Sequence, residues 1–248
     1  MSSKDHFSIQ SDIYAKYRPK YPDELFRFLS GLCPEHELVW DCATGNGQAA
    51  SSLSQYFKKV YASDLSPQQI SNSVQKDNIQ YNIEQAEKCT LPDDSVDLIT
   101  VATAIHWFGI LNFYEQVHRV LKPAGILAVW GYAGCTINEQ LDKVLNNFAF
   151  NTLEKYWPPE TKLNWKDRYE SLPFPYPIMK TEPFVATALY NLEDLLNYLF
   201  SWSATQKFIQ KHRKNPVDDI RSELLRAWGN PDEKKIVKWN LHFKCGRK

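Results

Sequence analysis

One short turn carries the residue types most suited to chemistry. Residues 39–50 read V-W-D-C-A-T-G-N-G-Q-A-A, and Asp64 stands 19 residues after Gly45. Gly45 and Gly47 can adopt positive φ at little cost and let the backbone approach a ligand closely. A helix expected from Gln48 would add free N–H groups, and Asp64 could accept both hydroxyls of a ribose through charged hydrogen bonds of about 1.5–3 kcal/mol each. The pattern predicts a site for a nucleotide-containing cofactor.

Two cofactors fit this turn, and Asp41 favours one of them. Gly45-x-Gly47-x-x-Ala50 matches the dinucleotide pattern G-x-G-x-x-G/A, as in an NAD-dependent oxidoreductase. Counted from Asp41, the same residues match the D-x-G-x-G-x-G turn of S-adenosylmethionine (SAM) enzymes, with Ala43 in the first glycine position. A carboxylate ahead of the glycines repels a pyrophosphate but suits the ammonium and sulfonium charges of SAM. Asp41 could also brace the turn through backbone N–H groups, and the two roles are compatible.

The elements that must position this turn alternate between strand and helix. Short apolar runs alternate with amphipathic ones from Glu37 to Tyr132, the pattern of βαβ units with a parallel sheet. Ser66 and Pro67 should open one helix as its N-cap and first residue. Ligands bind at the carboxyl ends of such strands, where the turn lies. Strands are predicted over 38–41, 59–64, 81–86, 96–103 and 125–132, and helices over 48–57 and 112–121.

After Tyr132 the pattern changes to longer helical segments. Helices are predicted over 137–156, 193–211 and 217–227, and an alternating strand over 235–244. The stretch 157–177 holds five prolines and should be irregular. We expect residues 133–181 and 190–230 to form a lid on the open end of the sheet rather than an independent domain.

Four segments in this order resemble a known family. VWDCATGNGQAA, VYASDLS, AEKCTLPDDSVDLITVATAIHWF and FYEQVHRVLKPAGILAVWGY together resemble class I SAM-dependent methyltransferases of the type 11 group. YAKYRPKYP (14–22) and AIHWF (104–108) are similar to the trans-aconitate methyltransferase-like branch of small-molecule enzymes. The resemblance covers residues 7–132 well and the C-terminal third more loosely.

The resemblance implies a fold and a division of the chain. The fold would be α/β, Rossmann-like and of the class I methyltransferase type, with a seven-stranded, mostly parallel sheet flanked by helices and a helical lid inserted in the C-terminal half. Residues 1–36 would cover the cofactor, and residues 37–132 would form the SAM-binding core. Residues 133–248 would supply the lid, the substrate region and the last strands of the same sheet.

The resemblance also implies which residues contact SAM. Ala43 departs from the glycine pattern, which costs little unless φ is positive there. The methionine part of SAM would lie against Thr44, Gly45, Asn46 and Gly47, with Asp41 behind them. The ribose would bind to Asp64, and the adenine would pack against Leu65, Ala86 and Glu87. The sulfonium would lie above Ala102, Thr103 and Ala104.

Methyl transfer makes modest demands on catalytic side chains. It is an in-line displacement on an activated carbon, so orientation alone can contribute up to about 7–11 kcal/mol, and a base is needed only when the acceptor starts protonated. His106 and Trp107 are the catalytic candidates. His106 is either a structural side chain or a contact to the acceptor, and Trp107 either packs in the core or walls the methyl group. Trp130 and Tyr132 should face the acceptor or pack beneath it.

The N-terminal segment offers further ligand contacts. Tyr14 is expected to fold over the cofactor together with Tyr17 and Tyr21, although Tyr21 is best explained by packing. Arg18 would clamp the carboxylate of SAM or an acidic substrate, unless it forms a surface ion pair.

Composition bounds the acceptor class. The 29 basic and 29 acidic residues cancel, which argues against a nucleic-acid binder, and the N-P-P-Y type tetrad of base-amine methylation is absent after the fourth predicted strand. A small-molecule acceptor, at a carboxylate or hydroxyl oxygen, is therefore our first hypothesis. The basic excess of residues 205–248 leaves an RNA or protein methyltransferase as an alternative, and a SAM-binding module without turnover as another.

The setting follows from what the sequence lacks. No apolar run is long enough to cross a membrane, and the five scattered cysteines form neither a C-x-x-C pair nor a zinc-binding pattern. We expect a cytoplasmic protein without a metal site or membrane partner, acting as a monomer or weak homodimer.

Overall fold

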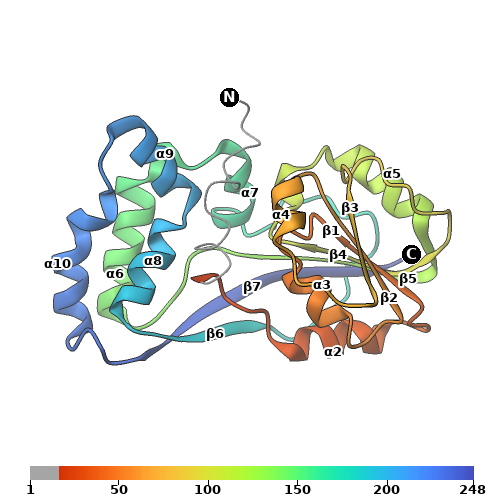
Figure 1. Ribbon diagram of the computed structural model, residues 1–248, viewed down its shortest axis with the longest axis horizontal. Coiled ribbons are helices and arrows are strands. Elements are labelled where there is room, and N and C mark those ends of the chain that lie inside the picture. Colours follow the sequence, from red (N-terminus) through yellow and green to blue (C-terminus); the bar gives the residue numbers. More distant parts are fainter. Residues whose placement is uncertain (1–16) are drawn as a thin grey trace.

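Seven strands form one sheet in the computed structural model, which describes residues 17–248 (Figure 1). Their order across the sheet is β3-β2-β1-β4-β5-β7-β6. The first five strands run parallel, and β7 is antiparallel to both β5 and β6. This confirms the expected α/β fold with its seven-stranded, mostly parallel sheet. The strands are β1 (Leu38–Cys42), β2 (Lys59–Asp64), β3 (Ile79–Ile83), β4 (Val96–Ala102), β5 (Leu121–Tyr132), β6 (Val185–Tyr190) and β7 (Lys235–Arg247).

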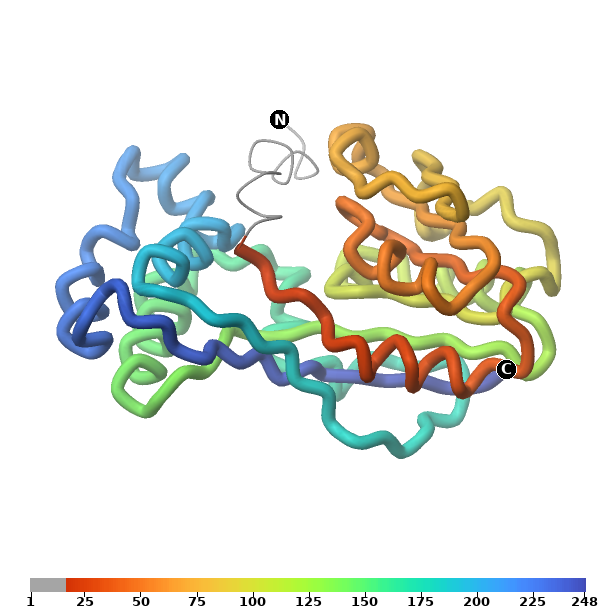
Figure 2. The backbone as a smooth tube through the Cα atoms, turned by 60° about the horizontal axis from the view of Figure 1, so that its bottom comes forward, coloured from red at the N-terminus to blue at the C-terminus, as the bar shows by residue number. Residues whose placement is uncertain are grey.

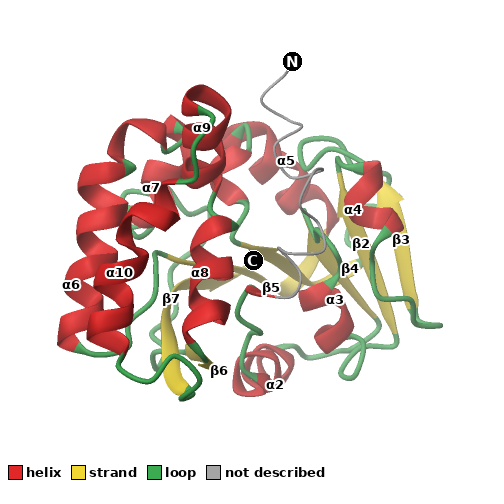
Figure 3. Ribbon diagram, turned by 60° about the vertical axis from the view of Figure 1, so that its left-hand side comes forward, coloured by secondary structure: helices red, strands yellow, loops and turns green. Residues whose placement is uncertain are grey.

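Helices flank the parallel strands and gather at the β6–β7 end of the sheet (Figures 1 and 3). Ser66 begins one of them as predicted, because its hydroxyl accepts a hydrogen bond from Gln69 N and Pro67 follows it. The α-helices are α2 (Asp23–Leu32), α3 (Gln48–Leu53), α4 (Pro67–Ser71), α5 (Ile110–Val120), α6 (Glu139–Asn147), α7 (Lys162–Trp165), α8 (Leu192–Phe200), α9 (Ser203–His212) and α10 (Pro216–Trp228). Shorter helical turns are η2 (Ile105–Trp107), η3 (Phe148–Thr152), η4 (Glu154–Tyr156) and η5 (Pro159–Thr161).

The central parallel strands β1 and β4 bury both of their faces, as parallel strands covered by helices do. On one face Val39 and Leu98 belong to a core that includes α2, α3 and the C-terminal helices. On the other face Trp40 and Ile99 pack with α5. Alternate residues of one strand therefore serve two separate cores.

Several predicted boundaries differ from the structure. The helix expected over 137–156 is α6 followed by the separate turns η3 and η4, and the helix expected over 48–57 ends at Leu53. The helix expected over 193–211 is two helices, α8 and α9, because Trp202 takes an extended backbone between them and buries its ring against Tyr198 and Trp157. The strand expected over 81–86 begins and ends earlier, as β3. The strand expected over 125–132 starts at Leu121, with an irregular register against β4 and a positive φ of 64° at Ala124.

Two short elements had no clear sequence signal. β6 has six residues and is an edge strand, so little alternation marks it. α7 is a single turn inside the proline-rich stretch, which is otherwise irregular as expected.

The segment before α2 runs beside β6, far from it in sequence (Figure 2). Tyr190 Oη donates a hydrogen bond to the carbonyl oxygen of Tyr17 at 2.6 Å, and the Phe28 and Phe184 rings lie 5.5 Å apart. This contact carries residues 18–21 to the carboxyl ends of the central strands.

A buried carboxylate joins the amino-terminal ends of three parallel strands. Asp97 is 2% exposed, and its Oδ2 accepts hydrogen bonds from the backbone N–H groups of Glu37 and Leu38 at 2.8 Å each. Its Oδ1 lies 2.7 Å from Lys122 Nζ. The start of β1 is thereby tied to β4 and β5.

Removing this carboxylate should destabilise the fold strongly. Asp97→Ala leaves two N–H groups without their acceptor and the partly buried Lys122 ammonium with only the exposed Glu35, so we expect a loss of about 3 kcal/mol in the free energy of unfolding by urea titration. Asp93→Ala is the control, because Asp93 also pairs with a cation but is 75% exposed. It should cost less than about 1 kcal/mol, and equal losses in the two variants would contradict this account.

Candidate cofactor and acceptor site

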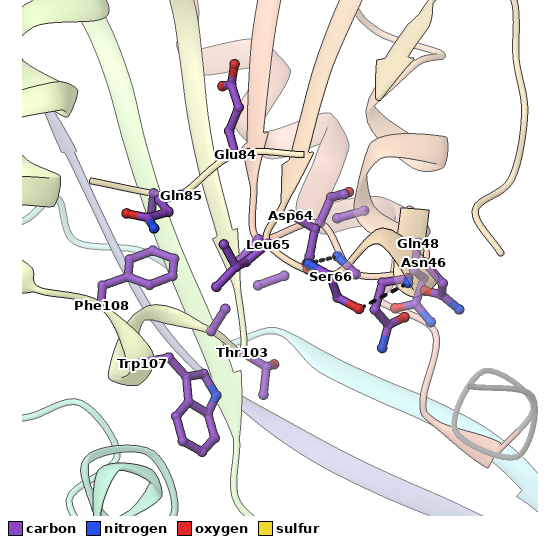
Figure 4. Close-up of a pocket in the computed structure, with 18 of the residues that line it drawn as sticks. Asn46, Gln48, Asp64, Leu65, Ser66, Glu84, Gln85, Thr103, Trp107 and Phe108 are labelled. Carbon is purple, nitrogen blue, oxygen red and sulfur yellow. Dashed lines mark hydrogen bonds between the residues drawn. The ribbon is translucent and has the colours of Figure 1, made fainter. Parts of the chain in front are cut away.

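A cavity of about 1020 Å³ lies at the carboxyl ends of β1 to β5. This is the edge at which sheets of this type bind ligands. Figure 4 shows Asp64, Leu65 and Ser66 on one side of this space and Trp107 and Phe108 on another. The lining residues are Arg18, Pro19, Tyr21, Ala43, Thr44, Gly45, Asn46, Gln48, Ala49, Asp64, Leu65, Ser66, Pro67, Gln69, Glu84, Gln85, Ala86, Glu87, Ala102, Thr103, Ala104, Trp107, Phe108, Gly109, Asn112, Tyr132 and Glu160.

The turn after β1 has three residues in the left-handed region. The φ angles of Ala43, Gly45 and Gly47 are 54°, 58° and 80°. The assumption that alanine costs little at position 43 is therefore wrong, because an L side chain is strained at positive φ. Gly47 lies just outside the cavity wall, and a Cβ there would collide with Tyr81 Oη. Glycine at position 47 is required by this close approach.

Asp41 lies behind the turn rather than in the cavity wall. Its side chain is buried, with Oδ2 accepting a hydrogen bond from Thr44 Oγ1 at 2.5 Å and Oδ1 accepting one from Thr100 Oγ1 at 2.7 Å. Burial raises the pKa of Asp41 to about 6, although both hydroxyls favour the charged form. Asp41 is fully buried and does not line the cavity, so in this structure it braces the turn from below.

Asp64 holds the turn from the cavity side. Its Oδ2 accepts a hydrogen bond from Gly45 N at 2.9 Å and its Oδ1 accepts one from Ser66 N at 2.8 Å. Burial raises its pKa. Each carboxylate oxygen has a second acceptor position, so Asp64 can receive two further donors from a ligand.

Apolar side chains stand around the space next to Asp64. Leu65 is 43% exposed and Trp107 is 37% exposed, and both line the cavity. Glu87 lines the cavity while its Oε1 accepts a hydrogen bond from Gly109 N at 2.7 Å. That bond ties the loop after β3 to the loop after β4, and a flat apolar ligand group would fit between such walls.

The far end of the cavity, beside β4 and β5, combines aromatic and polar groups. Arg18 donates hydrogen bonds to Tyr132 Oη and to the carbonyl oxygen of Ser201, each at 3.3 Å. Its guanidinium also lies 5.6 Å from the centre of the Tyr198 ring. The N-terminal segment, β5 and the end of α8 therefore meet at one cation.

Thr103 and Tyr21 complete the same end. Tyr21 Oη and Thr103 Oγ1 are 3.1 Å apart, and Thr103 has a positive φ of 55°. A β-branched residue in this conformation is strained, a condition often found at functional sites. The sequence interpretation assigned Tyr21 to packing, but Tyr21 also lines the cavity. Trp130 packs against Tyr21 and Phe26 and does not line it.

His106 lies behind the cavity wall, unlike its neighbour Trp107. Its Nδ1 is 3.0 Å from Tyr169 Oη, its ring centre is 5.1 Å from that of Trp107, and it is not a lining residue. Burial lowers its pKa to about 4, so it is neutral at pH 7 and a weak base. Of the two catalytic candidates, only Trp107 is at the surface of the cavity.

Most predicted contact residues do line this one cavity. The exceptions are Asp41, Gly47 and His106, and Tyr14 lies outside the described residues. Most of the lining residues that the sequence interpretation missed lie within ten positions after a strand end, and that proximity was the signal that could have found them, whereas Pro19 belongs to the segment before α2. The missed residues are Pro19, Gln48, Ala49, Ser66, Pro67, Gln69, Glu84, Gln85, Phe108, Gly109 and Asn112, with Glu160 arriving from a distant segment.

Residues 17–248 contain neither a membrane-spanning helix nor a cluster of metal ligands. None of the helices described there is both long and apolar enough to cross a membrane. Within the same residues, no group of three or more His, Cys, Asp or Glu side chains is placed to hold a metal ion.

Comparisons with known proteins show which family the chain belongs to. The family described as "Methyltransferase domain" matches residues 40–129. A protein of Dictyostelium discoideum named "Putative methyltransferase" is 34% identical over 242 residues, covering 96% of this chain and 92% of its own length. A yeast protein (Saccharomyces cerevisiae) named "Probable S-adenosylmethionine-dependent methyltransferase CRG1" is 28% identical over 137 residues, covering 50% of this chain and 46% of its own.

A solved structure matches over nearly the whole chain. It is described as a "Putative Type II Methyltransferase from Anaeromyxobacter dehalogenans" and superposes with a TM-score of 0.87 at 31% identity. The match covers 93% of this chain and 97% of that one.

Relieving the strain at position 43 should stabilise the protein. Ala43→Gly removes the Cβ that opposes a φ of 54°, so we expect about 1 kcal/mol more stability and a rise of about 2–4 °C in Tm by calorimetry. Ala188→Gly in β6 is the control, because Ala188 has an extended backbone that does not favour glycine. This variant should lose about 0.5–1 kcal/mol of stability. A loss of stability in both variants would show that Ala43 is not strained.

Proposed function

Since the chain belongs to the class I SAM-dependent methyltransferases, in the family of the domain that matches residues 40–129, we propose that it transfers the methyl group of SAM to an oxygen atom of a small organic molecule. The observation that carries the proposal is the shape of the cavity. It runs from the glycine turn to a second end enclosed by Arg18, Tyr21, Trp107 and Tyr132.

The residues at the first end suit SAM. Asp64 keeps free acceptor positions for the ribose hydroxyls, and Leu65 presents an apolar surface for the adenine. Glu87 and Ala86 would border the adenine edge, while Thr44, Gly45 and Asn46 would border the methionine part. When bound, SAM supplies a methyl carbon activated by a positively charged sulfur.

The residues at the second end would select and orient the acceptor. A volume of about 1020 Å³ is at the upper limit for small-molecule sites, which leaves room beside a cofactor for an acceptor of modest size. Arg18 is oriented by Tyr132, Ser201 and the Tyr198 ring. A guanidinium held in this way suits a carboxylate, either of the acceptor or of SAM itself.

Orientation rather than proton transfer would then account for most of the acceleration. A carboxylate acceptor is already a nucleophile at pH 7 and needs no base. His106 supplies a poor one, because burial lowers its pKa to about 4 and it faces Tyr169. The walls formed by Trp107 and Tyr132 would exclude water and align the acceptor oxygen with the methyl carbon, an alignment that can contribute up to about 7–11 kcal/mol.

A screen with radiolabelled methyl groups tests the acceptor class. The protein is incubated with methyl-labelled SAM and, in separate arms, small carboxylic acids, small alcohols and phenols, total RNA, and denatured protein. We expect label in the acid or hydroxyl arms. Label confined to the RNA or protein arm would replace this proposal with the macromolecular alternative.

Asp64→Ala tests the cofactor end. Loss of its carboxylate removes two ribose acceptors, so the Kd for S-adenosylhomocysteine should rise at least tenfold by calorimetry, with each charged hydrogen bond contributing about 1.5–3 kcal/mol. Asp77→Ala is the control, since Asp77 is outside the cavity wall and should leave the Kd unchanged.

Thermal unfolding measured with NAD⁺ and, separately, with S-adenosylhomocysteine tests the oxidoreductase alternative. A ligand at a hundred times its Kd raises stability by about 2.7 kcal/mol, so a thermal shift would reveal either cofactor. A shift with NAD⁺ and none with S-adenosylhomocysteine would overturn the assignment of the cofactor site.

A further inference from the structure

Residues 159–172, here called the strap, cross behind the second end of the cavity. The strap contains η5, α7 and a turn in which Arg168 and Tyr169 both have positive φ, 54° and 61°. Figure 1 shows α7 between the C-terminal helices and the parallel strands. One strap residue, Glu160, lines the cavity directly.

The strap holds the end of β5 through a glycine. Gly131 lacks a side chain at the point where a Cβ would come within 2.5 Å of Asn164 Oδ1 and 2.8 Å of the Tyr169 ring. This gap lets Asn164 Nδ2 donate a hydrogen bond to the carbonyl oxygen of Tyr132 at 3.0 Å. The backbone of Tyr132, whose side chain lines the cavity, is thereby held from behind.

The strap holds a second wall residue through His106. Tyr169 Oη and His106 Nδ1 are hydrogen-bonded at 3.0 Å, and the two rings are stacked with centres 6.2 Å apart. His106 lies against Trp107, with ring centres 5.1 Å apart. A displacement of Tyr169 would therefore move Trp107 as well.

The strap is anchored firmly enough to act as a support. Tyr169 is 1% exposed and Leu172 is 3% exposed, both within the core that includes α5. Tyr169 N also donates a hydrogen bond to the carbonyl oxygen of Leu163 at 2.9 Å. A bulky residue keeps a left-handed backbone only where its surroundings impose it, and here the space above Gly131 accepts its ring.

We propose that the strap determines acceptor specificity, with Asn164 and Tyr169 as positioning residues that hold Tyr132 and Trp107 in place. This inference rests on the proposed function for the meaning of the second end. In this arrangement neither Asn164 nor Tyr169 contacts the cofactor end. The two ends of the cavity should therefore respond differently when the strap is altered.

Tyr169→Phe is the decisive variant, because it keeps the buried ring and removes only the hydroxyl that bonds His106. The protein is labelled with 5-fluorotryptophan, and Trp107→Phe identifies the Trp107 fluorine resonance. We expect that resonance to shift in Tyr169→Phe, while the Kd for S-adenosylhomocysteine stays within twofold. With the acceptor that takes most label in the screen, KM should rise at least fivefold.

Tyr176→Phe is the matched control. Tyr176 forms the same kind of stacked pair with His118, with ring centres 6.4 Å apart and Oη 3.4 Å from Nδ1, but neither residue lines the cavity. Its variant should leave the Trp107 resonance and the acceptor KM unchanged. Asn164→Ala is the second variant and should raise KM through Tyr132.

The outcomes separate this inference from the proposed function. An unchanged Trp107 resonance in Tyr169→Phe, or a Kd for S-adenosylhomocysteine that rises as much as KM, would overturn the positioning role. If the screen yields no small acceptor, the proposed function fails. The fluorine resonance and the Kd would still show whether the strap holds Trp107 independently of the cofactor end.

Discussion

The turn between β1 and α3 is the constraint on which the site depends. Ala43, Gly45 and Gly47 all take positive φ within five residues. The two glycines do so at little cost, whereas Ala43 keeps this conformation only where neighbouring groups impose it. Two carboxylates do so from opposite sides. Asp41 is bonded to Thr44 beneath the turn, and Asp64 is bonded to Gly45 N at the cavity. Because β1 is central and parallel strands end together, this bend opens directly onto the ligand-binding edge of the sheet.

Burial separates the roles of these two carboxylates. Asp41 is enclosed, and its raised pKa reflects the cost of a charge far from water. It is fully buried and outside the cavity wall, so it can act on a ligand through the shape of the turn and through its charge behind it. Asp64 is similar chemically but borders the cavity, with acceptor positions remaining. Sequence spacing alone could not distinguish a brace from a contact.

The second end of the cavity is assembled from segments that are distant in the chain. Arg18 comes from the N-terminal segment, Thr103 and Trp107 from the end of β4, and Tyr132 from the end of β5. The contact between β6 and the segment before α2 brings the first of these into place. The second end therefore depends on contacts with the C-terminal half, whereas the end beside the glycine turn depends mainly on residues 41–87.

The sequence by itself determined the parallel sheet, most element positions and most of the cofactor end, because these follow from local patterns: apolar runs, a glycine turn and an acid at a strand end. Only the tertiary structure decided that Ala43 is strained and that His106 faces Tyr169 instead of the cavity. It also decided that Tyr21 and Glu160 line the cavity. Those outcomes depend on which distant side chains meet above Gly131 and beside β5, and no local spacing encodes such contacts.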